Sequence, residues 1–318
     1  MTDSPVAPLV IAHRGACGYL PEHTLPSKAL AYGMGADYLE QDVVATRDDQ
    51  LIVLHDIHLD TVSDVAERYP NRARADGRWY ARDFDLAEVR SLNAFERMNT
   101  DRDAAAFPNR FPFRQGRFQI PSLADEIEMI QGMNRASGRN VGIYPEIKKP
   151  AWHHAEGVDV ADLMLEMLEA YGYTDRTDAV YLQCFDALET RRLREELGTD
   201  LRIVQLLADN SWGESETDYA ALQTADGLAG VANYADGIGP WLNQLYETNE
   251  QGTNPVPTRL GELAHENGLT IHPYTFRADS LAPGFSDYAS LVRWMTEFVK
   301  IDGLFTDFPD LTLAVLGR

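Results

Sequence analysis

Two histidines and three carboxylates close apolar runs in the first half of the chain. His13 ends the first run, Glu40 and Asp42 end the second, Glu146 ends the third, and His55 follows a short apolar segment. Side chains alternate along a strand, so Glu40 and Asp42 point to the same side. Crowded carboxylates repel one another unless a cation neutralises them, and oxygen ligands suit Mg²⁺, Ca²⁺ or Mn²⁺ better than zinc. The pattern predicts a site for one divalent cation, with Ca²⁺ or Mg²⁺ as the leading candidates.

His13 and His55 are the candidates for proton transfer, because the acid or base that works near neutral pH is most often histidine. Arg14 follows His13, and Lys148 lies two residues after Glu146, so two cations could hold a phosphate. A lone histidine at a strand end is more often a hydrogen-bonded core residue, but the whole set favours a metal-dependent phosphodiesterase. The remaining histidines receive no catalytic role from their spacing: His23, His58, His153, His154, His265 and His272.

Eight apolar runs have the length of buried strands, and helical patterns separate most of them. The strands are predicted over residues 9–13, 36–43, 141–148, 180–185, 201–207, 236–240, 269–276 and 303–306. Helices are predicted over residues 25–32, 123–134, 160–170, 188–197, 219–234, 260–267 and 288–299. This alternation predicts an α/β protein with a (β/α)8 TIM barrel, in which the strands' carboxyl ends carry the site. A doubly wound open sheet is the alternative, although no Gly-x-Gly-x-x-Gly follows the first strand.

Residues 57–119 interrupt the alternation of strands and helices. This stretch has weak periodicity, is rich in aromatic residues, and is too long for an ordinary loop. Removing its 63 residues leaves 255 of 318, near the roughly 250 residues of a typical barrel. We therefore expect residues 1–318 to form a single domain with an insertion after the second strand, packed as a small subdomain that narrows the mouth of the site.

Composition excludes several classes of protein. The formal net charge is −22, so no basic surface is available for nucleic acid, and an anionic substrate must be attracted locally. No apolar run approaches the length of a membrane helix, so no membrane insertion is expected. Cys17 and Cys184 are expected to be unpaired thiols. No signal peptide is visible, which predicts a cytoplasmic protein, or a periplasmic one if a leader was removed before this numbering.

Eight separated segments, in order along the chain, resemble the glycerophosphodiester phosphodiesterase family. They include His13-Arg14-Gly15, Pro21-Glu22-His23-Thr24, Glu40-x-Asp42, Thr46-x-Asp48, His55-Asp56, Glu146-Ile147-Lys148 and Gly303-Leu304-Phe305-Thr306-Asp307-Phe308-Pro309-Asp310. Three further segments resemble the longer, periplasmic type of bacterial enzyme: residues 180–186, 234–240 and 272–277. The resemblance runs from residue 9 to the C-terminus and includes the insertion.

The resemblance implies a TIM barrel that hydrolyses glycerophosphodiesters, such as glycerophosphocholine or glycerophosphoethanolamine, to sn-glycerol 3-phosphate and an alcohol. A related phosphodiesterase acting on lysophospholipid or glycerophosphoinositol is the alternative. The implied roles are metal binding by Glu40, Asp42 and Glu146, acid–base catalysis by His13 and His55, phosphate contact by Arg14 and Lys148, and pocket lining by Gln183 and Phe276. The implied partner is a small-molecule substrate, and a homodimer is left open.

Two other classes of function compete with this interpretation. A barrel enzyme that uses a metal and carboxylates on an enolisable acid would place a Lys or Tyr base where this chain has paired histidines. A non-catalytic protein that keeps the fold should have lost one of the acid–base or metal residues. The chain retains His13, Glu40, Asp42 and His55, which favours the phosphodiesterase.

Overall fold

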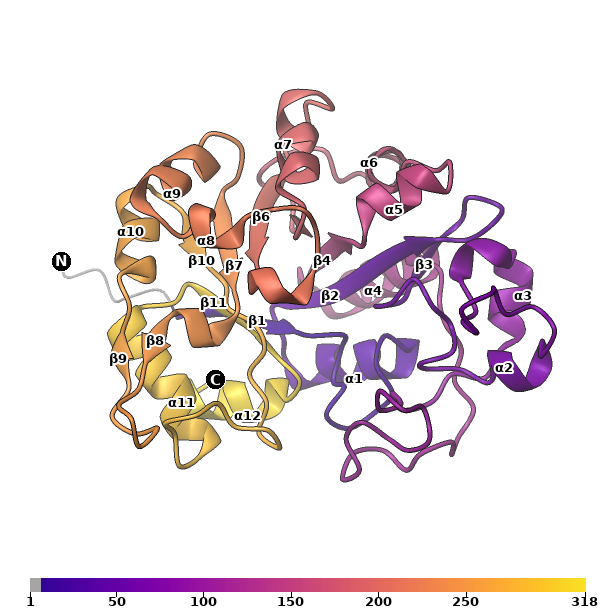
Figure 1. Cartoon of the computed structure of the whole chain (residues 1–318), viewed down its shortest axis with the longest axis horizontal. Coiled ribbons are helices and arrows are strands. Elements are labelled where there is room, and N and C mark those ends of the chain that lie inside the picture. The colour runs from indigo at the N-terminus through magenta and orange to yellow at the C-terminus, as the bar shows by residue number, and fades with distance from the viewer. Residues whose placement is uncertain (1–6) are drawn as a thin grey trace.

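A parallel sheet of eight strands forms the centre of the molecule (Figure 1). The computed structural model describes residues 7–318. The strands lie in the order β10-β7-β6-β5-β4-β2-β1-β11, each parallel to its neighbours. Their bounds are β1 Leu9–Ala12, β2 Tyr38–Ala45, β4 Gly142–Ile147, β5 Tyr181–Cys184, β6 Arg202–Leu207, β7 Gly237–Pro240, β10 Thr270–Ile271 and β11 Gly303–Thr306. All eight predicted strands are present, so the predicted barrel is confirmed.

Hydrogen bonds between the two ends of this sheet close the barrel. The strand predicted over residues 269–276 is regular only in β10, because Pro273 has no N–H to donate. The chain beyond β10 nevertheless stays paired with β11. The Phe305 N–H donates to the Pro273 carbonyl at 3.0 Å, and the Phe276 N–H donates to the Phe305 carbonyl at 2.8 Å. The carboxyl ends of all the strands therefore face one common site.

Helices pack around the barrel where the sequence pattern places most of them. They are α1 (Leu25–Met34), α4 (Leu123–Ser137), α5 (Pro150–Ala155), α6 (Val160–Ala170), α7 (Ala187–Glu195), α8 (Tyr219–Leu222), α9 (Ala225–Val231), α10 (Leu260–Glu266), α11 (Tyr288–Trp294) and α12 (Pro309–Val315). The helix predicted over residues 219–234 is two helices, because the Thr224 side chain caps α9 and accepts from the Gly227 N–H at 3.1 Å. A π-helical turn, Met295–Val299, continues α11. Among residues 7–318, no helix has both the length and the apolar character required to cross a bilayer.

The inside of the barrel below the site is filled with aromatic rings. The rings of Tyr144 and Tyr181 stack 4.9 Å apart, and Phe305 packs edge-on against Tyr144. The Tyr144 hydroxyl lies 2.8 Å from His272 Nδ1, so this histidine is a core residue. This aromatic layer supports the functional groups above it.

The insertion leaves the barrel after a short hairpin. β3 (Leu51–Val53) runs antiparallel to β2, and the chain then builds α2 (Val65–Arg68), a 3₁₀ turn at Ala81–Asp83 and α3 (Leu86–Ser91) before it returns at α4. Figure 1 shows this purple segment beside β2, on the right of the view. Leu59, Phe84 and Val89 form a second apolar core there, together with Val44 and Ile52 of the hairpin. The structure therefore has a packed segment after the second barrel strand, and the predicted bounds of the insertion, 57–119, stay a prediction.

Candidate active site

A cavity of about 260 Å³ opens at the carboxyl ends of the barrel strands. It is lined by all the predicted site residues except Phe276, namely His13, Arg14, Glu40, Asp42, His55, Glu146, Lys148 and Gln183. The volume suits the reacting part of a small organic molecule. The topology therefore brings residues from four strands and the hairpin into one site.

The three carboxylates occupy neighbouring positions on β2 and β4. Asp42 pairs with Glu146 in the register between these strands, and Glu40 lies two residues before Asp42. Burial, followed by the charge of Asp42, raises the pKa of Glu40 well above its ordinary value, and the same causes raise the pKa of Glu146 to about 8. Against the effect of burial, the charge of Lys148 holds the pKa of Asp42 well below its ordinary value, and Lys148 Nζ also lies 2.7 Å from Glu146 Oε1. The local positive charge thus ionises Asp42 but not all three carboxyls, and an oxygen donor set of this kind fits a hard divalent cation.

His23 also belongs to this site, although its spacing gave it no role. Its Nε2 lies 2.7 Å from Asp42 Oδ2, and burial lowers its pKa to about 3, so its ring is neutral and fixes one Asp42 oxygen by a hydrogen bond. The motif Pro21-Glu22-His23-Thr24 was the only sequence signal for it. His23 orients a carboxylate of the candidate metal site.

Arg14 lies on a turn that only a glycine can complete. Arg14 has a φ of 56° and Gly15 a φ of 90°, and a Cβ on Gly15 would lie 2.6 Å from Ser27 Oγ. The turn aims the Arg14 N–H at Glu40 Oε2, at 2.6 Å. The buried Nε of Arg14 makes no hydrogen bond within residues 7–318 but lies 3.5 Å from Asp42 Oδ2, close enough for an ion pair. The Arg14 guanidinium lies on the cavity wall, where its charge can attract an anionic oxygen.

Each of the two histidines is held by its own carboxylate. His13 Nδ1 lies 2.6 Å from Asp307 Oδ1, and His55 Nδ1 lies 2.6 Å from Asp56 Oδ1. A carboxylate at Nδ1 favours the tautomer with the proton on that atom, which leaves Nε2 able to accept a proton. Burial lowers the pKa of His13 to about 4 and also lowers the pKa of His55, so both rings are neutral at pH 7.

Aromatic side chains complete the wall of the cavity. Phe185, Trp212, Trp241 and Tyr274 line it, and the rings of the two tryptophans lie 5.1 Å apart at 60°. Gln183 is 2% exposed and also lines the cavity. The structure thus offers an apolar surface beside the charged groups.

The prediction that Phe276 lines the pocket is corrected by the structure. Its side chain is completely buried in the hydrophobic core between barrel and helices. Its neighbours Thr275 and Arg277 line the cavity instead. Phe276 therefore belongs to the core and not to the cavity wall.

An outer groove connects this cavity to the insertion. It is bordered by Arg14, His55 and Lys148 on the barrel side and by residues of the insertion that include Arg97 and Phe107. The predicted insertion therefore borders the approach to the site.

Comparison with known proteins agrees with this geometry. The model of the glycerophosphoryl diester phosphodiesterase family matches residues 13–311. The chain belongs to this family. It is 43% identical to the glycerophosphodiester phosphodiesterase of Haemophilus influenzae, over 97% of this chain and 89% of that protein. It is 36% identical to that of Treponema pallidum, over 98% of this chain and 92% of that protein.

Solved structures of similar fold include two bacterial phosphodiesterases. The glycerophosphodiester phosphodiesterase of Agrobacterium tumefaciens has a TM-score of 0.62 at 20% identity, covering 96% of this chain and 99% of its own. A phosphodiesterase of Oleispira antarctica, solved with the product sn-glycerol-3-phosphate, has a TM-score of 0.63 at 18% identity, covering 98% of both chains. The expected family, enzyme class and barrel fold are thus confirmed for this glycerophosphoryl diester phosphodiesterase family member.

Proposed function

We propose that the protein hydrolyses glycerophosphodiesters, with glycerophosphocholine or glycerophosphoethanolamine as candidate substrates, to sn-glycerol 3-phosphate and an alcohol. The observation that carries the proposal is the pair of carboxylate-held histidines on one cavity with Arg14, Lys148 and three buried carboxylates. Hydrolysis of a phosphodiester requires two groups that transfer protons, and it is helped by cationic side chains that bind the phosphate. The product bound in the Oleispira antarctica enzyme supports the same reaction.

Glu40, Asp42 and Glu146 would hold one divalent cation, Ca²⁺ or Mg²⁺. Bound there, the cation would supply positive charge for a phosphate oxygen and stabilise the transition state. The high pKa of Glu146, about 8, and the raised pKa of Glu40 agree with a site whose ionised form requires a cation. His23 would keep Asp42 oriented toward it.

Side chains of the protein bind the phosphate and transfer the protons. Arg14 and Lys148, which both line the cavity, bind the phosphate and offset its charge. One histidine, in its neutral form, accepts the proton of the nucleophile at Nε2. The other must be protonated at Nε2, a form that the charge of a bound phosphate favours, and it donates that proton to the departing alcohol oxygen. Either water or the neighbouring glycerol hydroxyl fits as nucleophile, and either histidine fits as base. Asp56 and Asp307 stabilise whichever imidazole becomes charged.

The test is the release of glycerol 3-phosphate from glycerophosphocholine. Activity should disappear when a chelator removes divalent cations and return when Ca²⁺, Mg²⁺ or Mn²⁺ is restored. Glycerophosphoethanolamine, glycerophosphoinositol and a lysophospholipid assayed in parallel would define the head group. Release that persists at full rate in the chelator would refute the metal requirement, and no release from any of the four would refute the reaction. A cytoplasmic or periplasmic location and a homodimer stay predictions from the sequence.

A further inference from the structure

An arginine of the insertion, Arg97, contacts Asp56, the carboxylate that holds His55. Arg97 Nη1 donates to Asp56 Oδ2 at 2.8 Å, while Asp56 Oδ1 lies 2.6 Å from His55 Nδ1. The Thr61 hydroxyl donates to the same Oδ2 at 2.7 Å. Both oxygens of Asp56 are therefore occupied, one by the histidine and the other by donors from the insertion. A carboxylate fixed in this way cannot rotate away from the imidazole.

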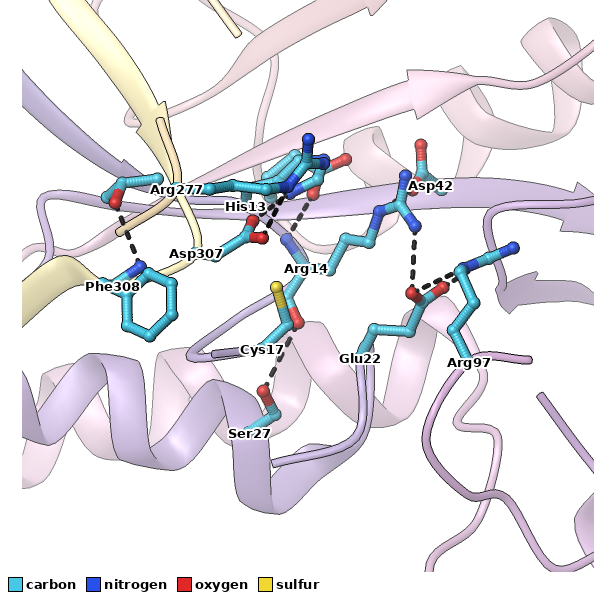
Figure 2. Close-up of polar contacts among 12 residues, drawn as sticks. His13, Arg14, Cys17, Glu22, Ser27, Asp42, Arg97, Arg277, Asp307 and Phe308 are labelled. Carbon is cyan, nitrogen blue, oxygen red and sulfur yellow. Dashed lines mark hydrogen bonds and ion pairs between the residues drawn. The ribbon is translucent and has the colours of Figure 1, made fainter. Parts of the chain in front are cut away.

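A second arginine of the insertion does the same for His13. Arg110 Nη2 donates to Asp307 Oδ2 at 2.6 Å, and Asp307 Oδ1 lies 2.6 Å from His13 Nδ1. Arg277 of the barrel donates to the same Oδ2 at 2.8 Å, and Figure 2 shows it with His13 around Asp307. Arg110 is itself anchored by Asp279, at 2.9 and 3.1 Å. The two histidine–carboxylate pairs thus share one arrangement, and the barrel alone supplies neither in full.

We propose that Arg97 and Arg110 are positioning residues for catalysis. Each holds a carboxylate, Asp56 or Asp307, in the ionised form and in the orientation that keeps the proton on Nδ1 of the adjacent histidine. The insertion is therefore a working part of the active site as well as a border of its mouth. This inference rests on the proposed function, in which both histidines transfer protons.

Arg97 also connects the proton-transfer side of the site to the phosphate side. Its Nε and Nη2 donate to the two oxygens of Glu22 at 2.8 and 2.6 Å, and Glu22 accepts from Arg14 Nη1 at 3.0 Å. Figure 2 shows the Glu22 carboxylate in contact with both Arg14 and Arg97. One planar guanidinium therefore fixes two carboxylates with three N–H groups, which lysine cannot reproduce.

The alternative is that these arginines only fasten the insertion to the barrel. Arg97→Gln and Arg110→Gln separate the two roles when kcat and KM are measured on protein shown to be folded by circular dichroism. A positioning role predicts a fall in kcat of about 10- to 100-fold, typical for partners that orient a functional side chain, with KM changed less than about threefold. Arg97→Lys restores the charge but not the fork, so its kcat should stay below that of the wild type.

Arg74→Gln is the matched control. Arg74 lies in the same insertion and forms an equally forked ion pair with Asp83, at 2.8 Å for both bonds. Its partners, Asp83 and Glu156, contact neither histidine of the site, so this variant should keep the wild-type kcat. A loss equal to that of Arg97→Gln would assign the effect to the insertion's stability.

Two further measurements make the inference refutable. In a His55→Ala background, Arg97→Gln should lower kcat by much less than it does in the wild type, because the part of its effect that passes through Asp56 and His55 is already lost and only the part through Glu22 and Arg14 remains. A full additional loss in that background, or an unchanged kcat in folded Arg97→Gln, would overturn the inference. Each histidine is expected to show a strongly deshielded Nδ1 proton in NMR spectra of the wild type without substrate, and this resonance should disappear for His55 in Arg97→Gln and for His13 in Arg110→Gln. This readout needs no turnover, so it tests the positioning role even if the proposed reaction fails; unchanged resonances would refute it.

Discussion

His13 and His55 are equivalent in their surroundings, since each has a carboxylate at Nδ1 and faces the cavity. His13→Ala and His55→Ala should each lower kcat by about 10²- to 10⁴-fold, because each removes one of two proton transfers. His154→Ala is the control, since His154 is half-exposed and outside the cavity. Steady-state release of glycerol 3-phosphate measures all three, and near-normal turnover of His55→Ala would contradict the two-histidine scheme.

Glu96 gives the insertion a pH-dependent stability. Burial, then the charges of Glu22 and Asp307, raise its pKa to about 8, and its Oε2 has no hydrogen-bond partner among the described residues. The folded protein thus keeps a proton that the unfolded chain releases above about pH 4.5, so stability is lost as the pH rises from about 5 to 8. Glu96→Gln removes this loss.

The measurement is urea unfolding of the wild type and Glu96→Gln at pH 5 and pH 8. The variant should gain on the order of 3 kcal/mol relative to the wild type between these two pH values. The wild type at each pH is the control for every other titrating group. An equal difference between the two proteins at pH 5 and pH 8 would show that Glu96 is ionised in both states.

The sequence predicted which site residues share a side when they lie close together in the chain. It did not predict the hydrogen-bond partners that lie far apart in the chain. The i, i+2 spacing of Glu40 and Asp42 fixed their common side because strands alternate. Asp307, which holds His13, is 294 residues away along the chain, and only closure of the barrel brings it there. The contact between His23 and Asp42 was not predictable for the same reason, since it depends on how the chain before α1 approaches β2.

At the scale of elements, a buried ion pair fastens α1 and α4 to the strand that carries the carboxylates. Lys28 Nζ donates to Glu126 Oε1 and to the Glu40 carbonyl, both at 2.5 Å, and Gln41 Nε2 donates to Glu126 at 2.7 Å. Lys28 and Glu126 are completely buried. Lys28→Met leaves Glu126 buried without its cation and should lower the free energy of unfolding by about 3–5 kcal/mol.

Urea unfolding of Lys28→Met, Glu126→Gln and the double variant tests this coupling. The double variant should be more stable than the sum of the single effects predicts, because removing both charges leaves no uncompensated carboxylate. Additive losses would mean that the two side chains do not stabilise each other.

Element prediction succeeded where periodicity was strong and failed where it was weak. The barrel strands β2 and β4 are buried on both faces, as parallel strands covered by helices must be, and their apolar residues made them recognisable. The insertion's helices α2 and α3 are only 4 and 6 residues long, too short to leave a helical pattern. Its contribution to the site could not be predicted, because Arg97 and Arg110 act through contacts with Glu22, Asp56 and Asp307 across the fold.

At the scale of the whole molecule, binding of a cation at the candidate metal site should stabilise the folded protein against unfolding. A ligand that binds only the folded state stabilises it by about 2.7 kcal/mol at 100 times its Kd. Ca²⁺ or Mg²⁺ should therefore raise the Tm of the wild type, because Glu40, Asp42 and Glu146 are buried and repel one another without a cation.

The double variant Glu40→Gln/Glu146→Gln should show no rise in Tm when Ca²⁺ or Mg²⁺ is added. In the chelator its Tm should be at least as high as that of the wild type, because two repelling carboxyls have been removed. Sodium chloride at matched ionic strength controls for screening of the net charge of −22. An equal rise in Tm for both proteins would place the cation elsewhere on this acidic surface.

Trp212 and Trp241 give the cavity a property of a different kind. Their indole rings lie 5.1 Å apart at 60° on the wall of the cavity, close enough for their electronic transitions to couple. The chain's other tryptophans, Trp79, Trp152 and Trp294, do not line it. The near-ultraviolet circular dichroism of the pair therefore depends on what fills the space beside it. The protein carries its own optical reporter, so occupancy of the cavity can be followed with light alone, without a label and without turnover.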